Sequence, residues 1–266
     1  MPVVAVLSMK GGVGKTSMTL GLASAAWDRG LRVLVIDLDP QANASMALDV
    51  VDAAFTTSDV LADARPGVAA DAVSATGWGD RVDAIAAERG LEHRTADGGR
   101  NAALRLRTGL ATLPKAYDLV LIDCPPSLGE LTRNALCAAD RAIVVTEPNY
   151  FALHGAAEAL GAIDVIAQSV NPRLRAATVL VNRFRPDDRE HLLNASRLAQ
   201  EHGPLVYDPP VPDCPGIPAS QRAVSPIHAW NSPGSREVAD VMDDLLDTLV
   251  PRPQPEPRVS LRRYFT

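Results

Sequence analysis

The feature that most constrains this chain is a glycine-rich segment, Ser-Met-Lys-Gly-Gly-Val-Gly-Lys-Thr-Ser, at residues 8–17. It follows an apolar run at Val3–Leu7 and precedes a segment with helical character at residues 18–28. Glycine lets the backbone curl so that successive N–H groups face one anion, and the N-terminus of a following helix strengthens that attraction. The order of strand, loop and helix therefore predicts a phosphate-binding loop.

Two lysines in this loop are expected to have different roles. Lys15 follows the glycines and would supply a cation to the β- and γ-phosphates of a nucleotide, and the Thr16 hydroxyl is a candidate Mg²⁺ ligand. The common pattern has glycine at position 9, where this chain has methionine, and a second lysine, Lys10, comes next. Because Lys10 lies too far back to duplicate Lys15, we expect it to serve a phosphate held by another subunit. The predicted nucleotide-binding residues of the loop are Lys10, Gly11, Gly12, Val13, Gly14, Lys15, Thr16 and Ser17.

Lysine usage supports this interpretation over a glycine turn with incidental lysines. The chain contains three lysines, at positions 10, 15 and 115, against 23 arginines, and two of the three fall in this loop.

Composition limits the class of protein. With 266 residues, 47% of them hydrophobic and 22% charged, the chain is expected to form one large globular domain. A net charge of −6 argues against coating nucleic acid by bulk positive charge, although it leaves room for a local basic face. The three cysteines lack metal-binding spacing and are interpreted as reduced packing thiols. No apolar run approaches the roughly 18 residues of a spanning helix, so we expect a cytoplasmic protein.

Apolar runs alternate with segments of helical spacing along most of the chain. The runs at Val3–Leu7, 33–36, 119–122, 142–146 and Thr178–Val181 predict buried strands, with helices at 131–139 and 153–169. This alternation predicts a single-domain α/β fold with a mostly parallel twisted sheet and helices on both faces.

The domain is expected to span residues 1–250. Residues 251–266 are first proline-rich and then basic, and we expect them to form a flexible tail. Within the domain, residues 44–115 are alanine-rich and are expected to be helical, and the polar stretch at 93–100 has no assigned structure.

A pair of aspartates follows the second predicted strand. Asp37 and Asp39 share one side of an extended chain, at the strand end where an open α/β sheet binds its ligand. Two like charges on one side call for a cation between them. We expect Asp37 to organise the metal and the loop and Asp39 to orient an attacking water. An Asx-turn leading into Pro40 is the alternative.

A third aspartate, Asp123, follows the apolar run at 119–122. A buried strand that ends in aspartate next to a phosphate loop is the arrangement that brings a carboxylate to Mg²⁺. The predicted metal residues are therefore Thr16, Asp37 and Asp123.

The chain resembles the ParA-type partition ATPases, which belong with MinD to the deviant Walker A group of P-loop NTPases. The matching segments are residues 10–16, 37–41, 122–129, 131–136 and 147–155. The resemblance implies that ATP and Mg²⁺ are the cofactors and that the enzyme hydrolyses ATP to ADP and phosphate with low basal turnover. It also implies a homodimer with ATP sandwiched between the subunits.

The resemblance assigns further roles to single residues. Lys10 would contact the partner's nucleotide, and Lys10, Lys15 and Asp39 would form the catalytic set. Asn182, at the end of the run Thr178–Val181, matches the position that reads adenine, with a strand-end cap as the alternative.

The ParA branch implies that the ATP state binds DNA without sequence preference, associates with the nucleoid and drives plasmid or chromosome partition. A ParB-like partner would stimulate hydrolysis. The segments at 123–129 and 148–155 resemble this branch more than a MinD-like ATPase, which would act on a membrane. A cargo-positioning ATPase that acts on a protein assembly remains an alternative. The basic and aromatic residues at 258–266 could serve a membrane, but so short a segment buries little apolar surface, and we do not expect a membrane partner.

Arginines are the candidate DNA contacts, since phosphate binding requires cations. Residues 171–185 contain four arginines and no acid, although a solvated surface explains them nearly as well. Residues 211–216, Val-Pro-Asp-Cys-Pro-Gly, depart from the basic segment expected there. The candidates are Arg173, Arg175, Arg183, Arg185, Arg189 and Arg222.

Overall fold

The computed structural model describes residues 1–50, 52–96, 101–113, 117–175 and 178–252. In this part of the chain one sheet of seven strands has the order β3-β4-β2-β5-β1-β6-β7. All neighbouring strands are parallel except β3 and β4. The strands are β1 (Val3–Leu7), β2 (Val33–Asp37), β3 (Ser74–Ala75), β4 (Val82–Ile85), β5 (Leu119–Asp123), β6 (Arg141–Thr146) and β7 (Thr178–Val181).

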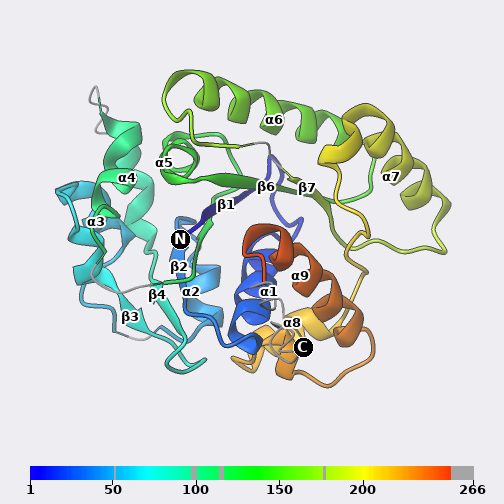
Figure 1. Cartoon of the computed structure of the whole chain (residues 1–266), viewed down its shortest axis with the longest axis horizontal. Helices are drawn as coiled ribbons and strands as arrows, with labels where there is room; N and C mark the ends of the chain where they lie inside the picture. The colour runs from blue at the N-terminus through cyan, green and yellow to red at the C-terminus, as the bar shows by residue number, and fades with distance from the viewer. Residues whose placement is uncertain (51, 97–100, 114–116, 176–177, 253–266) are drawn as a thin grey trace, which may run out of the picture.

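Helices connect the strands and cover both faces of the sheet (Figure 1). The α-helices are α1 (Lys15–Asp28), α2 (Asn43–Ala47), α3 (Thr57–Asp63), α4 (Arg105–Gly109), α5 (Glu130–Ala138), α6 (Ala152–Ser169), α7 (Arg189–His202), α8 (Gly216–Arg222) and α9 (Ser235–Leu249). Short 3₁₀ segments are η1 (Val68–Ala72), η2 (Arg89–Ala96), η3 (Ala102–Leu104), η4 (Gly203–Leu205) and η5 (Ile227–Ala229).

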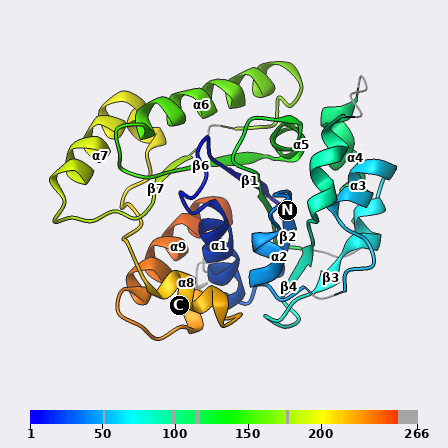
Figure 2. The same cartoon turned by 180° about the vertical axis from the view of Figure 1, so that it is seen from behind.

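Side-chain alternation along the strands builds two apolar layers. In β1, Ala5 and Leu7 pack with residues of α5 and α6, whereas Val4 and Val6 pack with residues of α1 and α9. Figures 1 and 2 show α4, α5 and α6 on one side of the sheet and α1 and α9 on the other. A sheet covered on both faces requires strands that are apolar throughout, which explains why five of the strands stand out as apolar runs in the sequence.

The predicted α/β architecture is confirmed, with one correction. The expectation that residues 44–115 are helical is wrong in part, because they also contain β3 and β4, and β4 pairs in parallel with β2. The sequence of β4, Val-Asp-Ala-Ile, contains an aspartate. This charged residue interrupts the apolar run by which the other parallel strands were predicted. In the fold Asp83 is buried and accepts a hydrogen bond of 2.8 Å from the Tyr117 hydroxyl, which makes its burial tolerable.

The expected domain boundary falls just after α9, which ends at Leu249. Most of the predicted tail, residues 253–266, lies outside the described residues, as does part of the polar stretch at 97–100. No helix among the described residues is both long and apolar enough to cross a membrane.

Asn171, which follows α6, hydrogen-bonds to the C-terminal end of α5. It is fully buried, and its amide donates to the Leu136 carbonyl at 2.9 Å and to the Ala139 carbonyl at 2.6 Å. We expect Asn171→Ala to lower the free energy of unfolding by about 2–3 kcal/mol, because two buried helix-end carbonyls would be left without their donor. Urea denaturation would measure the change. Gln168→Ala, at an exposed amide in α6, is the control and should shift it by less than ~0.5 kcal/mol; an equal effect of both would contradict the proposed fastening.

Candidate nucleotide-binding site

The sheet order brings the predicted loop and the predicted acids together. Strand β5 lies between β1 and β2, so the loop after β1 faces the ends of both. Asp37 and Asp123 are directly paired neighbours in the register of β2 and β5. The loop then leads into α1, whose first turn begins at Lys15. A cavity of about 620 Å³ opens above these strand ends.

The loop adopts the curled backbone that its glycines predict. Gly12 and Gly14 have φ values of +83° and +92°, which side-chain-bearing residues rarely adopt. Gly14 is required for a second reason, because a Cβ there would overlap the Asn182 amide. That amide donates to the Val13 carbonyl at 2.8 Å and supports the loop from the end of β7. No described residue hydrogen-bonds to its buried Oδ1.

The two lysines of the loop differ in their surroundings. Lys15 is buried and lines the cavity together with Gly11, Gly12, Gly14 and Thr16. Lys10 is exposed and does not contribute to that lining. Its backbone is held on both sides by Ser8, whose Oγ accepts from the Lys10 N–H and donates to the Lys10 carbonyl, both at 3.1 Å.

Asp123 lies at the base of the loop with both carboxylate oxygens engaged by α1. Oδ2 accepts from the Thr16 hydroxyl at 2.7 Å and Oδ1 from the Thr19 hydroxyl at 3.0 Å. Sequence reasoning missed Thr19, although its position one helical turn after Lys15 is the available signal. The two hydroxyls hold this carboxylate directly beneath the phosphate loop.

Asp37 organises the next loop. Its Oδ1 accepts from the Asp39 N–H at 3.0 Å, and its Oδ2 accepts from the Ser45 N–H at 2.9 Å and the Ser45 hydroxyl at 2.8 Å. These hydrogen bonds make Asp37 the organiser of the segment that carries Asp39 and Ser45.

Asp39 lines the cavity and also forms the Asx-turn that the sequence left as the alternative. Its Oδ1 accepts from the Gln41 N–H at 3.0 Å. The second carboxylate oxygen remains for other partners, so the turn and a role toward solvent in the cavity are compatible.

Burial raises the pKa of both paired carboxyls. Desolvation is the main cause for each, and it raises the pKa of Asp37 to about 6 and that of Asp123 to about 7. The Asp37 charge adds to the shift of the Asp123 pKa, whereas the hydroxyls of Thr16 and Thr19 oppose it. The folded protein thus holds acids that a nearby cation would stabilise in their charged form.

This donor set fits a nucleotide with Mg²⁺. The loop N–H groups and Lys15 suit phosphate, and the Thr16 hydroxyl beside Asp123 suits a hard cation that prefers oxygen. No group of three metal-binding His, Cys, Asp or Glu side chains gathers among the described residues. Mg²⁺ is usually held by few protein groups together with water and substrate phosphates.

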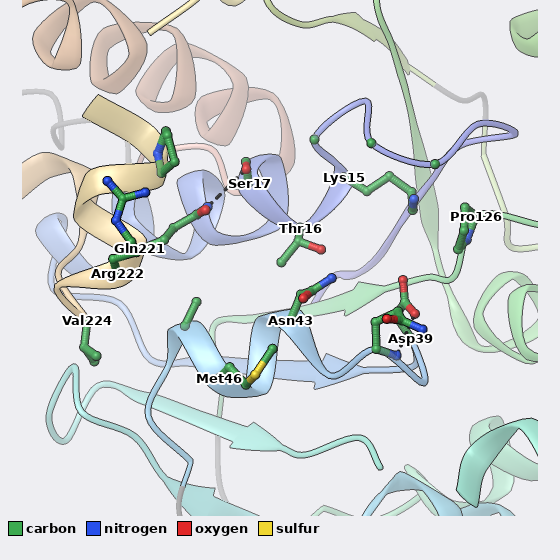
Figure 3. A pocket seen from close by; sticks show the side chains of 16 residues that line it. Lys15, Thr16, Ser17, Asp39, Asn43, Met46, Pro126, Gln221, Arg222 and Val224 are labelled. Atoms are coloured by element: carbon green, nitrogen blue, oxygen red, sulfur yellow. Dashed lines mark hydrogen bonds between the residues drawn. The ribbon is translucent and has the colours of Figure 1, made fainter. Parts of the chain in front are cut away.

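The far wall of the cavity was not predicted. Figure 3 shows Lys15, Pro126 and Asp39 at one end, and Gln221, Arg222 and Val224 of the α8 region at the other. Gln221 donates to the Ser17 hydroxyl at 3.1 Å and so joins α8 to the first turn of α1. Arg222, a candidate DNA contact, therefore lies at the nucleotide cavity.

The remaining candidate arginines fall into two groups. One group lies near the N-terminal ends of the parallel strands and the other near their C-terminal ends. Arg173 and Arg175 precede β7 and lie where the strands begin; the Arg175 N–H donates to the Asp140 carbonyl, just before β6. Arg183 and Arg185 follow β7, at the edge where the strands end.

Arg189 lies on the same side as this second group, because it begins α7. Here Arg183 forms an ion pair of 2.7 Å with Glu147, and Arg185 forms one of 2.5 Å with Asp188. The stretch 171–185 is consequently not one basic patch.

Replacing the Asp123 carboxyl should stabilise the ligand-free protein. A raised pKa in the folded state contributes stability below the ordinary value of 3.8, and this contribution disappears as pH rises through about 7. We expect Asp123→Asn to raise the free energy of unfolding by on the order of 1–3 kcal/mol near pH 8 and by less near pH 5.

Urea denaturation at both pH values would measure this effect. Asp164→Asn, at an exposed carboxyl of α6, is the control and should show no such pH-dependent gain. An Asp123→Asn protein that is no more stable than the wild type near pH 8 would show that the two threonine hydroxyls outweigh the burial cost.

Known proteins resemble this chain in both sequence and structure. Residues 1–176 match the family described as AAA domain. The chromosome partitioning protein ParA of Caulobacter vibrioides is 36% identical over 217 residues, covering 79% of this chain and 80% of that protein. The sporulation initiation inhibitor protein Soj of Bacillus subtilis is 33% identical over 183 residues, covering 67% and 71%.

A solved structure shares the fold of this chain. Cobyrinic acid a,c-diamide synthase from Mycobacterium smegmatis, with bound ATP analogue and magnesium, superimposes with a TM-score of 0.75 at 27% identity, covering 93% of this chain and 95% of that one. The ligands of that structure are the kind that the donor set of this site fits. The chain belongs to the ParA family of P-loop ATPases.

Proposed function

We propose that this chain is an ATPase that dimerises around ATP, binds DNA without sequence preference in that state and drives plasmid or chromosome partition. A ParB-like partner stimulates hydrolysis, and the protein works in the cytoplasm in association with the nucleoid. The observation that carries the proposal is the contrast between the two lysines of one loop: Lys15 is buried in the cavity, whereas Lys10 is exposed outside its lining.

This contrast supports an interaction between subunits. Ser8 fixes the backbone of Lys10 from both sides, so the lysine is presented at a defined place rather than on a loose turn. A cation that is held beside a phosphate loop but outside its cavity is suited to the nucleotide of a facing subunit. In a twofold dimer each Lys10 would serve the other subunit, and the nucleotide would join the two.

The chain's own groups account for slow turnover. Lys15 and the loop N–H groups hold the phosphates, Thr16 and Asp123 lie where Mg²⁺ is expected, and Mg²⁺ when bound supplies positive charge. Asp39 offers its remaining oxygen to orient water. Asn182 offers toward the base its buried Oδ1, which has no hydrogen-bond partner among the described residues. Phosphoryl transfer depends on positioning and charge neutralisation, so a site without its partner's Lys10 is incomplete.

We assign DNA binding to the arginines near the C-terminal ends of the strands, where the nucleotide cavity also lies. Arg183, Arg185 and Arg189 share that edge with Lys10, so closure of a dimer can bring two such sets together. Arg173 and Arg175 lie at the opposite edge, where nucleotide has no direct means of affecting them.

The two lysines should separate binding from dimerisation. We expect Lys15→Ala to weaken ATP affinity by about 10- to 100-fold, because the variant has no cation to form the charge-assisted hydrogen bond to phosphate. Lys10→Ala should change the ATP affinity of the monomer by less than ~3-fold, yet abolish both hydrolysis and the dimer formed with a non-cleavable ATP analogue.

Fluorescent-nucleotide titration and sedimentation velocity would measure these quantities. An equal decrease of ATP affinity in both variants would reject the role of Lys10 between subunits. A wild-type protein that stays monomeric when saturated with the analogue would reject the proposed function.

The arginine groups provide a matched pair of variants for DNA binding. With the ATP analogue present, Arg185→Ala/Arg189→Ala should reduce the slope of log affinity against log salt by up to ~0.9 for every DNA phosphate that the variant no longer neutralises. Arg173→Ala/Arg175→Ala removes the same charge from the opposite edge and should leave the slope unchanged.

Fluorescence anisotropy with DNA duplexes of unrelated sequence would measure both. The reverse order of effects would place the DNA surface at the other edge. ATP-dependent pelleting with anionic vesicles, without DNA binding, would favour the MinD-like alternative.

A further inference from the structure

A groove with both acidic and apolar lining lies between α3 and η1, apart from the nucleotide cavity. Its volume is about 400 Å³, and the side chains that line it include Phe55, Val68 and three aspartates, Asp59, Asp63 and Asp71. Phe55 is 50% exposed, although a large aromatic side chain gains free energy when it is removed from water. We call this feature the α3 groove.

The α3 groove carries a net negative charge. Arg65 is the one cation among the described residues of its lining, and it pairs with Asp63 at 2.6 Å and with Asp71 at 3.2 Å. The third carboxylate, Asp59, accepts from the Thr56 N–H at 2.8 Å and so caps α3. Three carboxylates against one guanidinium leave a net charge of −2. An occupant that matches this groove therefore combines positive charge with apolar side chains.

The α3 groove extends toward the N-terminal ends of the parallel strands. Thr57, the first residue of α3, donates its hydroxyl to the Asp37 carbonyl at 2.7 Å, so α3 begins where β2 ends. After α3, a Cβ on Gly67 would lie 3.3 Å from the Ala111 carbonyl oxygen. Ala111 in turn lines a second cavity together with Val3, at the start of β1. The far end of α3 is therefore close to the starts of the strands.

The last described residues lie at the same ends of the strands. Arg252 pairs with Asp247 at 3.1 Å, and Asp247 pairs with Arg29, just before β2, at 2.8 Å. Residues 253–266 follow from this point. α9 lies on one side of the sheet, whereas α3 packs with α4 on the other (Figure 1). Fourteen residues reach up to about 46 Å, and crossing from one helix layer to the other takes about 20 Å. The length of chain after Arg252 is sufficient to reach the α3 groove.

The sequence of this segment complements the charge and the apolar lining of the groove. Residues 258–266, Arg-Val-Ser-Leu-Arg-Arg-Tyr-Phe-Thr, contain three arginines, four apolar or aromatic side chains and no acidic side chain. The second cavity, of about 370 Å³, has the wrong charge for them, because Arg107 and Arg173 outnumber Asp140 in its lining. Of the two cavities that lie near the starts of the strands, charge selects the α3 groove.

We propose that residues 258–266 of this chain dock in the α3 groove. Their aromatic side chains pack against Phe55 and the apolar lining, and their arginines pair with Asp63 and Asp71. This contact goes beyond the proposed function, because it requires neither nucleotide, DNA nor a second copy of the chain. It gives the basic and aromatic segment an occupied place on its own domain in place of a free tail. The contact also falls on a helix whose first residue hydrogen-bonds to Asp37, at the nucleotide site.

Photo-crosslinking in the full chain tests the contact directly. Phe265 is replaced by p-benzoylphenylalanine, and the dilute protein is irradiated without nucleotide, digested and analysed by mass spectrometry. We expect an intramolecular crosslink to residues 55–72. Asp63→Asn/Asp71→Asn should lower its yield by at least ~5-fold, because two ion pairs with the segment are removed.

A second double variant, Asp240→Asn/Asp244→Asn, is the matched control. It removes the same charge from exposed positions of α9 and should change the yield by less than ~2-fold. The circular dichroism spectra of both double variants should match that of the wild type, because all four carboxylates lie at the surface.

The other outcomes overturn the inference. A crosslink to α9 would place the segment beside the domain end from which it starts, and a crosslink that joins two chains would assign it to a second copy. The absence of any crosslink within the protein would show that the segment has no place on this domain. An equal decrease of yield in both double variants would show that overall charge, and not the α3 groove, holds the segment. Because no nucleotide is present, each of these results leaves the proposed function standing.

Discussion

The rest of this site is built around two buried carboxyl groups that lie side by side, Asp37 and Asp123. The parallel pairing of β2 and β5 puts them in register, and burial raises the pKa of both. Such a pair is costly unless donors or a cation compensate. The hydroxyls of Thr16, Thr19 and Ser45 supply donors, and the loop above supplies Lys15. Burial makes the charged forms of these two carboxylates unfavourable in the ligand-free protein. A metal–nucleotide complex that brings a cation is favoured for this reason.

Each compensating group also shapes the loop that it belongs to. Thr16 and Thr19 connect the first turns of α1 to β5, so the phosphate loop cannot shift without disturbing Asp123. Ser45 connects α2 to β2 through Asp37 and sets the course of the segment that carries Asp39. The same hydrogen bonds that make burial tolerable therefore hold the phosphate loop and the cavity-lining Asp39 carboxylate in a fixed relation. Stability and pre-organisation of the site have one physical origin.

One edge of the sheet gathers the groups that can respond to nucleotide. These groups all follow the C-terminal ends of parallel strands. Lys10 follows β1, Tyr150 and Phe151 follow β6, and Arg183 and Arg185 follow β7. Parallel strands place every strand-to-helix connection on the same edge, so a ligand there contacts several elements at once. The proposed dimer closure and DNA binding at this edge would both depend on the occupant of one cavity.

Local signals in the chain were sufficient to predict the phosphate loop, five strands and the three strand-end aspartates, because apolar runs and glycine spacing are properties of short segments. The same signals did not predict β4, whose buried Asp83 accepts a hydrogen bond from Tyr117, 34 residues away. They also grouped Arg173 and Arg175 with Arg183 and Arg185. Strand β7 lies between the two pairs and places them at its opposite ends. Two features arise only when the chain has folded. They are the cavity wall formed by α8 and the small cavity that Lys10 and Phe151 both line. Each of these features depends on packing between segments far apart in the chain, which no local pattern records.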